Sequence, residues 1–224
     1  MECLWCQEAI MPEVNWATLV QLSPKRSLCP GCEEEMERIH GKRCPRCSKV
    51  GSDAVCRDCS WWEERMPKET LAQNYSVFSY NARMKEMIAK WKYRGDYHLG
   101  HAFKQHVKTA FADWNFSEEA IAVPIPLSEE RLQERGFNQA KMLASFLPLE
   151  TEEVLTRLHG EKQSKKTREE RILTENPFVL EKALHKPVVL VDDIYTTGTT
   201  LRHAGALLHA LGCPAVYAFT LIRG

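Results

Sequence analysis

The residues best suited to chemistry lie in the short stretch 188–200, whose sequence is VVLVDDIYTTGTT. Its four leading apolar residues predict a strand that is buried in a parallel sheet. Two carboxylates, Asp192 and Asp193, end this strand, and a loop of hydroxyl residues and one glycine follows. The apolar spacing of 201–211 then predicts a helix that ends at Gly212. A strand, loop and helix in this order point backbone N–H groups and a helix N-terminus at one place, which suits a phosphate group.

This stretch is similar, at all 13 positions, to the signature with which type I phosphoribosyltransferases bind 5-phosphoribosyl-1-pyrophosphate (PRPP). The resemblance implies that Asp192 and Asp193 are the catalytic carboxylates and hold the ribose hydroxyls, directly or through Mg²⁺. The 5-phosphate would lie in the loop made by Thr196, Thr197, Gly198, Thr199 and Thr200. Arg131, or a residue near Pro124, would face the pyrophosphate. The alternative is an ordinary strand–helix unit without a ligand, in which two adjacent carboxylates would be costly.

Eight of the nine cysteines form four C-x-x-C pairs: Cys3/Cys6, Cys29/Cys32, Cys44/Cys47 and Cys56/Cys59. Two such pairs can bind one tetrahedral metal ion, so the set predicts two structural zinc sites with no open position for a catalytic water. A redox motif is the alternative, but that motif usually occurs once. Sequential pairing would join the first pair with the second and the third with the fourth, and interleaved pairing remains possible. The ninth cysteine, Cys213, is predicted to fill space in the core.

Composition limits the remaining possibilities. The 30 Lys and Arg balance the 30 Asp and Glu, so nucleic-acid binding would have to come from local patches. The sequence shows neither a secretory signal nor an apolar run of roughly 20 residues that could span a membrane. We therefore expect a cytoplasmic protein without membrane insertion, in a compartment where thiols stay reduced.

The distribution of cysteines and apolar patterns predicts two domains. Residues 1–66 would form a small double zinc ribbon, residues 67–73 a linker, and residues 74–224 an α/β domain. Within that domain we expect strands at 75–80, 120–125, 188–191 and 215–222, and helices at 83–93, 99–114, 128–146 and 201–211. This alternation predicts a parallel sheet flanked by helices, with the ligand at the carboxyl ends of the strands. The resemblance of 188–200 implies that this sheet has the type I phosphoribosyltransferase-like fold. Trp61 and Trp62 would pack against the ribbon or the next domain.

Two basic segments could contact single-stranded DNA. Residues 83–94 carry five basic residues, one acid and interleaved aromatics, and residues 157–171 carry six basic residues and three acids. Cations neutralise phosphates while aromatic rings stack on bases, which predicts DNA contacts by Lys90, Lys92, Arg94, Lys165 and Lys166. The alternatives are a solvated helix face with Trp91 turned inward and a solvated loop. Residues 1–66 hold nine Lys and Arg against eleven Asp and Glu, which favours protein docking there over phosphate binding.

The chain resembles the ComF family in its cysteine pairs and in four segments that occur in the family's order: 90–96, 124–139, 163–171 and 188–200. Members of that family combine an N-terminal zinc ribbon with a phosphoribosyltransferase-like domain, and the resemblance covers nearly the whole chain. It implies a role in natural transformation, in the uptake or handling of single-stranded DNA, with recruitment to the membrane DNA-uptake machinery. It also implies partnership with a ComFA-like ATPase/helicase and a DprA-like recombination mediator.

Three functions are compatible with these features. The one we expect is a DNA-handling competence protein that still binds PRPP. The second is an active phosphoribosyltransferase that transfers the phosphoribosyl group to an unidentified nitrogen acceptor. The third is a PRPP-sensing regulator, against which the lack of a helix-turn-helix pattern argues.

Overall fold

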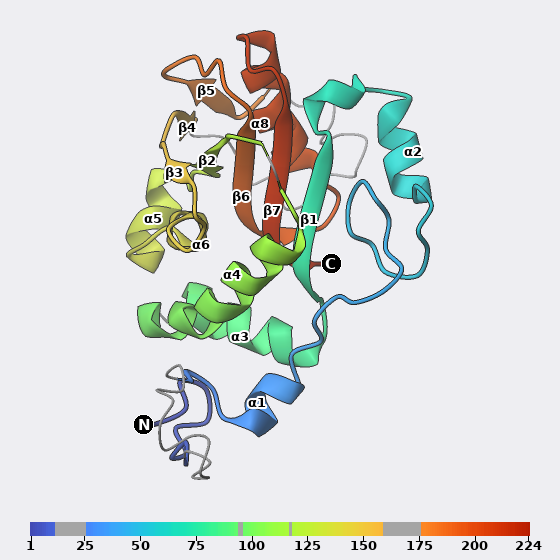
Figure 1. Cartoon of the computed structure of the whole chain (residues 1–224). Coiled ribbons are helices and arrows are strands. Elements are labelled where there is room, and N and C mark those ends of the chain that lie inside the picture. Colours follow the sequence, from blue (N-terminus) through green and yellow to red (C-terminus); the bar gives the residue numbers. More distant parts are fainter. Residues whose placement is uncertain (12–25, 94–95, 117, 159–175) are drawn as a thin grey trace.

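A parallel sheet of five strands lies at the centre of the protein (Figure 1). The computed structural model describes residues 1–11, 26–93, 96–116, 118–158 and 176–224. The sheet has the order β1-β7-β6-β2-β3, with β1 (Gln73–Ser79), β2 (Ile121–Pro124), β3 (Glu150–Thr151), β6 (Val188–Tyr195) and β7 (Val216–Arg223). All its pairings are parallel. The predicted α/β architecture is therefore confirmed, with the VVLV strand in the middle.

Helices cover both faces of this sheet. The described helices are α1 (Pro30–Glu34), α2 (Arg57–Glu63), η1 (Lys68–Thr70), α3 (Ala82–Tyr93), η2 (Tyr97–Phe103), α4 (Lys104–Asp113), α5 (Glu129–Arg135), α6 (Gln139–Ala144) and α8 (Thr199–Ala210). Val189 and Val191 share a buried cluster with α3, η2, α4 and α6. Val188 and Leu190 share the other cluster with α8 and the antiparallel pair β4 (Leu155–Arg157) and β5 (Phe178–Leu180). Adjacent residues of β6 thus point to opposite faces, and both faces are covered.

The free edge of β1 is covered by the segment that joins the two halves of the cysteine-rich region. Asn74 N donates to Arg46 O at 2.8 Å, and Ser76 N donates to Ser48 Oγ at 3.1 Å. The same Ser48 hydroxyl donates to Asn74 O at 2.9 Å. Unpaired edge groups invite pairing with other chains, so residues 37–48 protect the sheet in the way that an extra strand would.

Two of the predicted helices differ from those observed. The predicted helix 128–146 is two helices, because Gly136 adopts a left-handed conformation (φ 75°) that ends α5 and Asn138 caps the start of α6. The predicted helix 99–114 begins as the 3-10 helix η2, which Asp96 caps, and becomes α-helical only at Lys104. The predicted strand 188–191 continues through the two carboxylates and ends four residues later, at Tyr195. The other expected strands and helices lie within two residues of their predicted bounds. Among the described helices, none is both long and apolar enough to cross a membrane.

Ser48→Ala should destabilise the protein, because it leaves the buried Ser76 N–H and Asn74 carbonyl without their shared partner. An unsatisfied buried backbone group costs about 1–3 kcal/mol. Urea unfolding followed by circular dichroism measures this change. The exposed Ser52, four residues further along the chain and outside this segment, supplies the control: Ser52→Ala should change the free energy of unfolding by less than about 0.5 kcal/mol. Equal effects of both variants would contradict a structural role of Ser48 at the edge of β1.

Candidate functional site

Two adjacent carboxylates and a lysine meet at the carboxyl end of β6. Asp193 forms an ion pair with Lys92 of α3, and each of the two side chains is 13% exposed. The backbone N–H of Asp193 donates to Asp192 Oδ1 at 2.8 Å, which fixes the Asp192 carboxyl beside the strand end. Helix α3 thus brings Lys92, which the sequence predicts as a DNA contact, to the predicted sugar site.

The electrostatic environment of Asp192 is unusual for a carboxylate. Burial and the nearby charge of Asp193 raise the pKa of Asp192 to about 7, although Lys92 and Arg157 act in the opposite direction. Burial and the charge of Arg131 lower the pKa of the Arg157 guanidinium, whereas Asp192 raises it. Arg157 of β4 therefore lies within electrostatic reach of both Asp192 and Arg131. Reduced negative charge on Asp192 near neutral pH and two nearby arginines suit a site that binds a polyanion.

The loop after β6, residues 196–200, is held in one conformation by side chains that contact its glycine and its carbonyl groups. Gly198 is left-handed (φ 78°), and a Cβ there would lie 2.3 Å from both the Tyr195 hydroxyl and Arg202 Nη1. The carbonyl of Thr196 accepts from Arg223 Nη1 at 3.1 Å, and that of Thr197 accepts from Trp62 Nε1 at 2.8 Å. This contact confirms that Trp62 packs against the second domain.

Peptide geometry then fixes the direction of the loop amides. The described peptide bonds are all trans, so each N–H points opposite to the preceding carbonyl. The N–H groups of Thr197 and Gly198 therefore point away from Arg223 and Trp62. Helix α8 begins at Thr199, and its N-terminus adds partial positive charge at the same place. Oriented amides at a helix N-terminus form an anion-binding geometry.

The structure thus brings together the residues that the sequence assigned to the sugar phosphate, 192–193 and 196–200, on one strand, loop and helix. Lys92 and Arg157 join them from α3 and β4, which sequence reasoning did not predict as members of this site. Their only signal in the sequence was that each lies in a basic segment. Arg131 is exposed on α5, near Arg157, so its role toward pyrophosphate stays a prediction.

The predicted DNA contacts on α3 are less open than the sequence suggested. Trp91 is fully buried, so of the two interpretations the inward-turned tryptophan is observed and no base can stack on this ring. Lys90 forms an ion pair with Asp96 at 3.4 Å. Arg94, Lys165 and Lys166 lie outside the described residues. The assignment of these cations to DNA stays a prediction.

The eight paired cysteines form two four-thiol clusters. The first cluster is Cys3, Cys6, Cys29 and Cys32, and the second cluster is Cys44, Cys47, Cys56 and Cys59. Sequential pairing is therefore the observed arrangement. In each cluster the ligand atoms all lie within 4.8 Å of one another, and the closest Sγ–Sγ distances are 3.6–3.9 Å. A tetrahedral zinc ion with Zn–S bonds of about 2.3 Å needs S–S separations of about 3.8 Å, so the donor set and its spacing fit zinc.

The two clusters are built by the same local structure. In each, the second C-x-x-C pair begins a helix, α1 or α2, with a cysteine as N-cap. The N–H of that N-cap donates to a thiol of the first pair, Cys29 N to Cys3 Sγ and Cys56 N to Cys44 Sγ, both at 3.3 Å. The modules pack in different places, since the first cluster belongs to the core on the α3 and α4 side and the second to the core on the α8 side. Cys213 is buried, as predicted.

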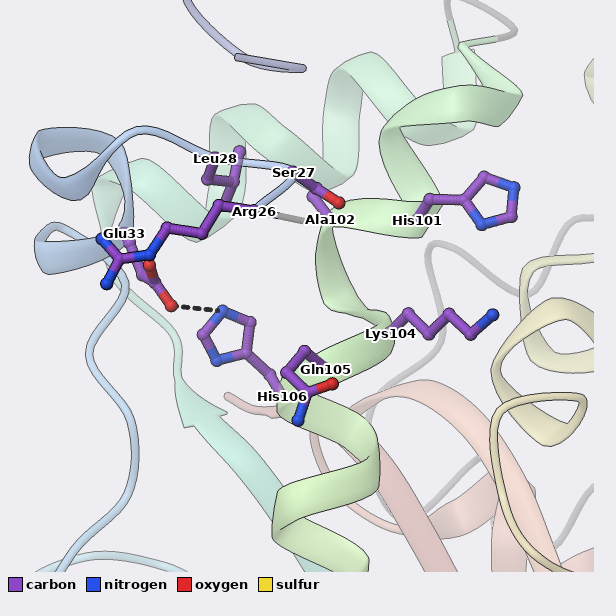
Figure 2. A pocket seen from close by; sticks show the side chains of 9 residues that line it. All are labelled: Arg26, Ser27, Leu28, Glu33, His101, Ala102, Lys104, Gln105 and His106. Carbon is purple, nitrogen blue, oxygen red and sulfur yellow. Dashed lines mark ion pairs between the residues drawn. The ribbon is translucent and has the colours of Figure 1, made fainter. Parts of the chain in front are cut away.

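A pocket lies between the first cluster and helices η2 and α4 (Figure 2). Figure 2 shows Arg26 extended over the Glu33–His106 ion pair, whose atoms are 3.3 Å apart, while His101 and Lys104 point the other way. Its lining shares no residue with the end of β6, so this pocket is separate from the site of Asp192 and Asp193.

Comparison with known proteins agrees with this fold. Residues 96–224 match the phosphoribosyl transferase domain family (Pribosyltran), so the chain carries a domain of that class. Along its full length it is similar to competence proteins. It is 42% identical over 226 residues to Competence protein ComFC of Bacillus subtilis (strain 168), covering 99% of this chain and 94% of the relative. Competence protein ComFC of Streptococcus pneumoniae is 33% identical, with both chains covered completely, and Competence protein F of Haemophilus influenzae is 26% identical, with 89% and 91% covered. The chain belongs to the ComFC family of competence proteins.

The raised pKa of Asp192 predicts a pH dependence of stability. The folded state keeps a proton on Asp192 up to about pH 7, whereas the unfolded chain releases it near pH 4. This stabilising contribution is complete below that lower value and is lost as the pH rises through 7. Asp192→Asn should therefore remove a decline in the free energy of unfolding between pH 4 and pH 7.

Urea unfolding at five pH values across this range measures the slope. The buried histidines His106 and His203, whose pKa values are lowered by burial, act in the opposite direction in both proteins and cancel in the difference. Asp113→Asn, at the end of α4, should keep the wild-type slope. Identical slopes for wild type and Asp192→Asn would show that Asp192 is already ionised in the folded protein.

Proposed function

We propose that this chain binds PRPP with Mg²⁺ at the end of β6 and handles single-stranded DNA in the cytoplasm during natural transformation. The observation that carries the PRPP part is the geometry of the β6–α8 loop, where oriented amides and two carboxylates lie side by side. The names of its relatives as competence proteins support the biological setting. Zinc in the two cysteine clusters would be structural, because four thiolates leave no open position.

Each part of the site suits one part of this ligand. The carboxylates of Asp192 and Asp193 would accept hydrogen bonds from the two ribose hydroxyls. The N–H groups of Thr197 and Gly198 would donate to the 5-phosphate, with the α8 N-terminus behind them. Arg157 and Arg131 would face the pyrophosphate. Asp192 and Asp193 would hold Mg²⁺ when it is bound, and the ion would offset the negative charge of the pyrophosphate.

DNA handling would rest on local charge, since the chain as a whole is neutral. Lys90, Arg94, Lys165 and Lys166 are the proposed contacts, with Lys92 shared between DNA and the sugar site. The proposed partners are a ComFA-like ATPase/helicase and a DprA-like recombination mediator, met at the membrane uptake machinery.

A second candidate function is phosphoribosyl transfer. In that reaction a nitrogen acceptor attacks C1 of PRPP, the C1–N bond forms, the C1–O bond breaks, pyrophosphate leaves and the acceptor nitrogen loses a proton. The observation that favours it is Asp192, because a carboxyl with a pKa of about 7 can accept a proton near neutral pH. The chain would contribute positioning and electrostatic stabilisation.

Calorimetric titration with Mg-PRPP tests the sugar site. We expect Asp192→Asn combined with Asp193→Asn to weaken binding at least tenfold, because hydrogen bonds to charged groups contribute about 1.5–3 kcal/mol each. Asp113→Asn is the matched control and should bind as wild type does. Absence of binding in the wild-type protein would end this proposal.

Fluorescence anisotropy with labelled single-stranded DNA, at two salt concentrations and with or without Mg-PRPP, tests the DNA part. We expect binding that weakens with salt, as phosphate contacts require, and that changes when PRPP is present. Pyrophosphate release measured in the same mixtures would favour the transferase function instead. A chain that binds no DNA at either salt concentration contradicts the DNA-handling function.

A further inference from the structure

Trp62 connects the second cysteine cluster to the loop of residues 196–200, which we call the phosphate loop. Helix α2 starts immediately after Cys56 and contains Cys59, and Trp62 follows one turn later. The indole is buried, with 1% of its surface exposed, and its Nε1–H donates to the Thr197 carbonyl at 2.8 Å. The position of this hydrogen-bond donor is therefore set by the same helix that presents two thiols to the cluster.

Arg223 makes a second connection between the second cluster and residues 196–200. Its guanidinium is buried at the end of β7, where Nη2 donates to Cys47 Sγ at 3.6 Å. Nη1 of the same group donates to the carbonyls of Thr196, at 3.1 Å, and Tyr195, at 3.3 Å. One planar group thus bridges a thiol of the second cluster and the first carbonyls of the loop.

A second arginine completes the contact. Arg202 of α8 stacks over the Trp62 ring at 4.6 Å and donates to the Tyr195 hydroxyl at 2.7 Å. Arg223 lies over the ring of the same tyrosine at 4.8 Å. Helix α8 is therefore connected to α2 through Arg202, and the tyrosine that ends β6 is connected to β7 through Arg223.

The first cluster has no comparable role among the described residues. It packs with Leu28 and Met36 against the core formed by α3 and α4, and none of its described contacts reaches 196–200. The chain therefore holds two clusters of the same construction, of which one is connected to the phosphate loop through Trp62 and Arg223. This difference supplies an internal control.

The loop carbonyls matter because they fix the amides. If Trp62 and Arg223 lose their fixed places, the peptides 196–197 and 197–198 are free to rotate and their N–H groups no longer converge. We propose that Trp62 and Arg223 are positioning residues through which a metal ion in the second cluster, and not one in the first, maintains the phosphate-binding conformation of residues 196–200. The ligand in this inference rests on the function proposed above, whereas the loop conformation does not.

Trp62→Phe isolates the hydrogen bond, because phenylalanine keeps an aromatic ring and lacks the N–H. We expect it to weaken Mg-PRPP binding about three- to tenfold, the effect of losing one hydrogen bond. Zinc content measured by mass spectrometry should remain that of the wild type. Trp114→Phe is the matched control, since Trp114 Nε1 also donates a single hydrogen bond, to Gln73 Oε1 at 3.0 Å, outside the loop. Arg223→Lys tests the second connection, because lysine keeps the charge but cannot bridge two partners.

Cys56→Ser and Cys6→Ser compare the two clusters. Each should remove one equivalent of zinc, but the loss of Mg-PRPP affinity should be larger for Cys56→Ser. Amide hydrogen exchange of a peptide covering 190–200 gives a readout that needs no PRPP. Exchange should be faster in Trp62→Phe and Cys56→Ser than in Trp114→Phe and Cys6→Ser.

The outcomes separate the two proposals. If wild type fails to bind Mg-PRPP, the proposed function falls, and the exchange rates still decide whether the second cluster holds the loop. If Cys56→Ser does not fold, Trp62→Phe and Arg223→Lys decide the question alone. Exchange rates that are the same in Trp62→Phe and Trp114→Phe, or in Cys56→Ser and Cys6→Ser, would overturn the inference.

Discussion

Two adjacent carboxylates at the end of a strand that is covered on both faces impose the main constraint on this structure. Charges in such a position are costly unless other groups compensate them, and Asp192 and Asp193 cannot move away because β6 lies in the middle of the sheet. Lys92 from α3 and Arg157 from β4 supply the compensation from opposite sides of the sheet. Elements distant in sequence are therefore positioned so that one short segment can carry its charge.

The cysteine-rich region is stabilised by its contacts with the central sheet and, when metal is bound, by its two cysteine clusters. It contains too few large apolar residues to fold on a core of its own, and each metal-binding module instead extends one face of the central domain. Between the modules, residues 37–48 close the edge of β1. The same region thus stabilises both faces and one edge of the sheet.

The sequence predicted those features that are local. The VVLV strand, the loop after it and the four C-x-x-C pairs were recognisable because their residue types and spacings are themselves the signal. The break at Gly136 was missed because an apolar period continues across it, although Arg-Gly inside a helix was already unfavourable. The contacts of Lys92, Trp62 and Arg223 were not predictable, since each joins elements whose relative placement only the folded sheet defines.

The order of strands in the sheet has a consequence for how the chain folds during synthesis. Among the described strands, β1 pairs only with β7, which is also the strand that separates β1 from β6. The first and last strands therefore meet across nearly the whole domain, and such long-range pairing is slow to form. Until residues 216–223 leave the ribosome, β1 has no partner strand, while the cysteine modules before it can already close around metal. Early metal binding would then protect one edge of β1 from pairing with strands of other chains until β7 has been synthesised.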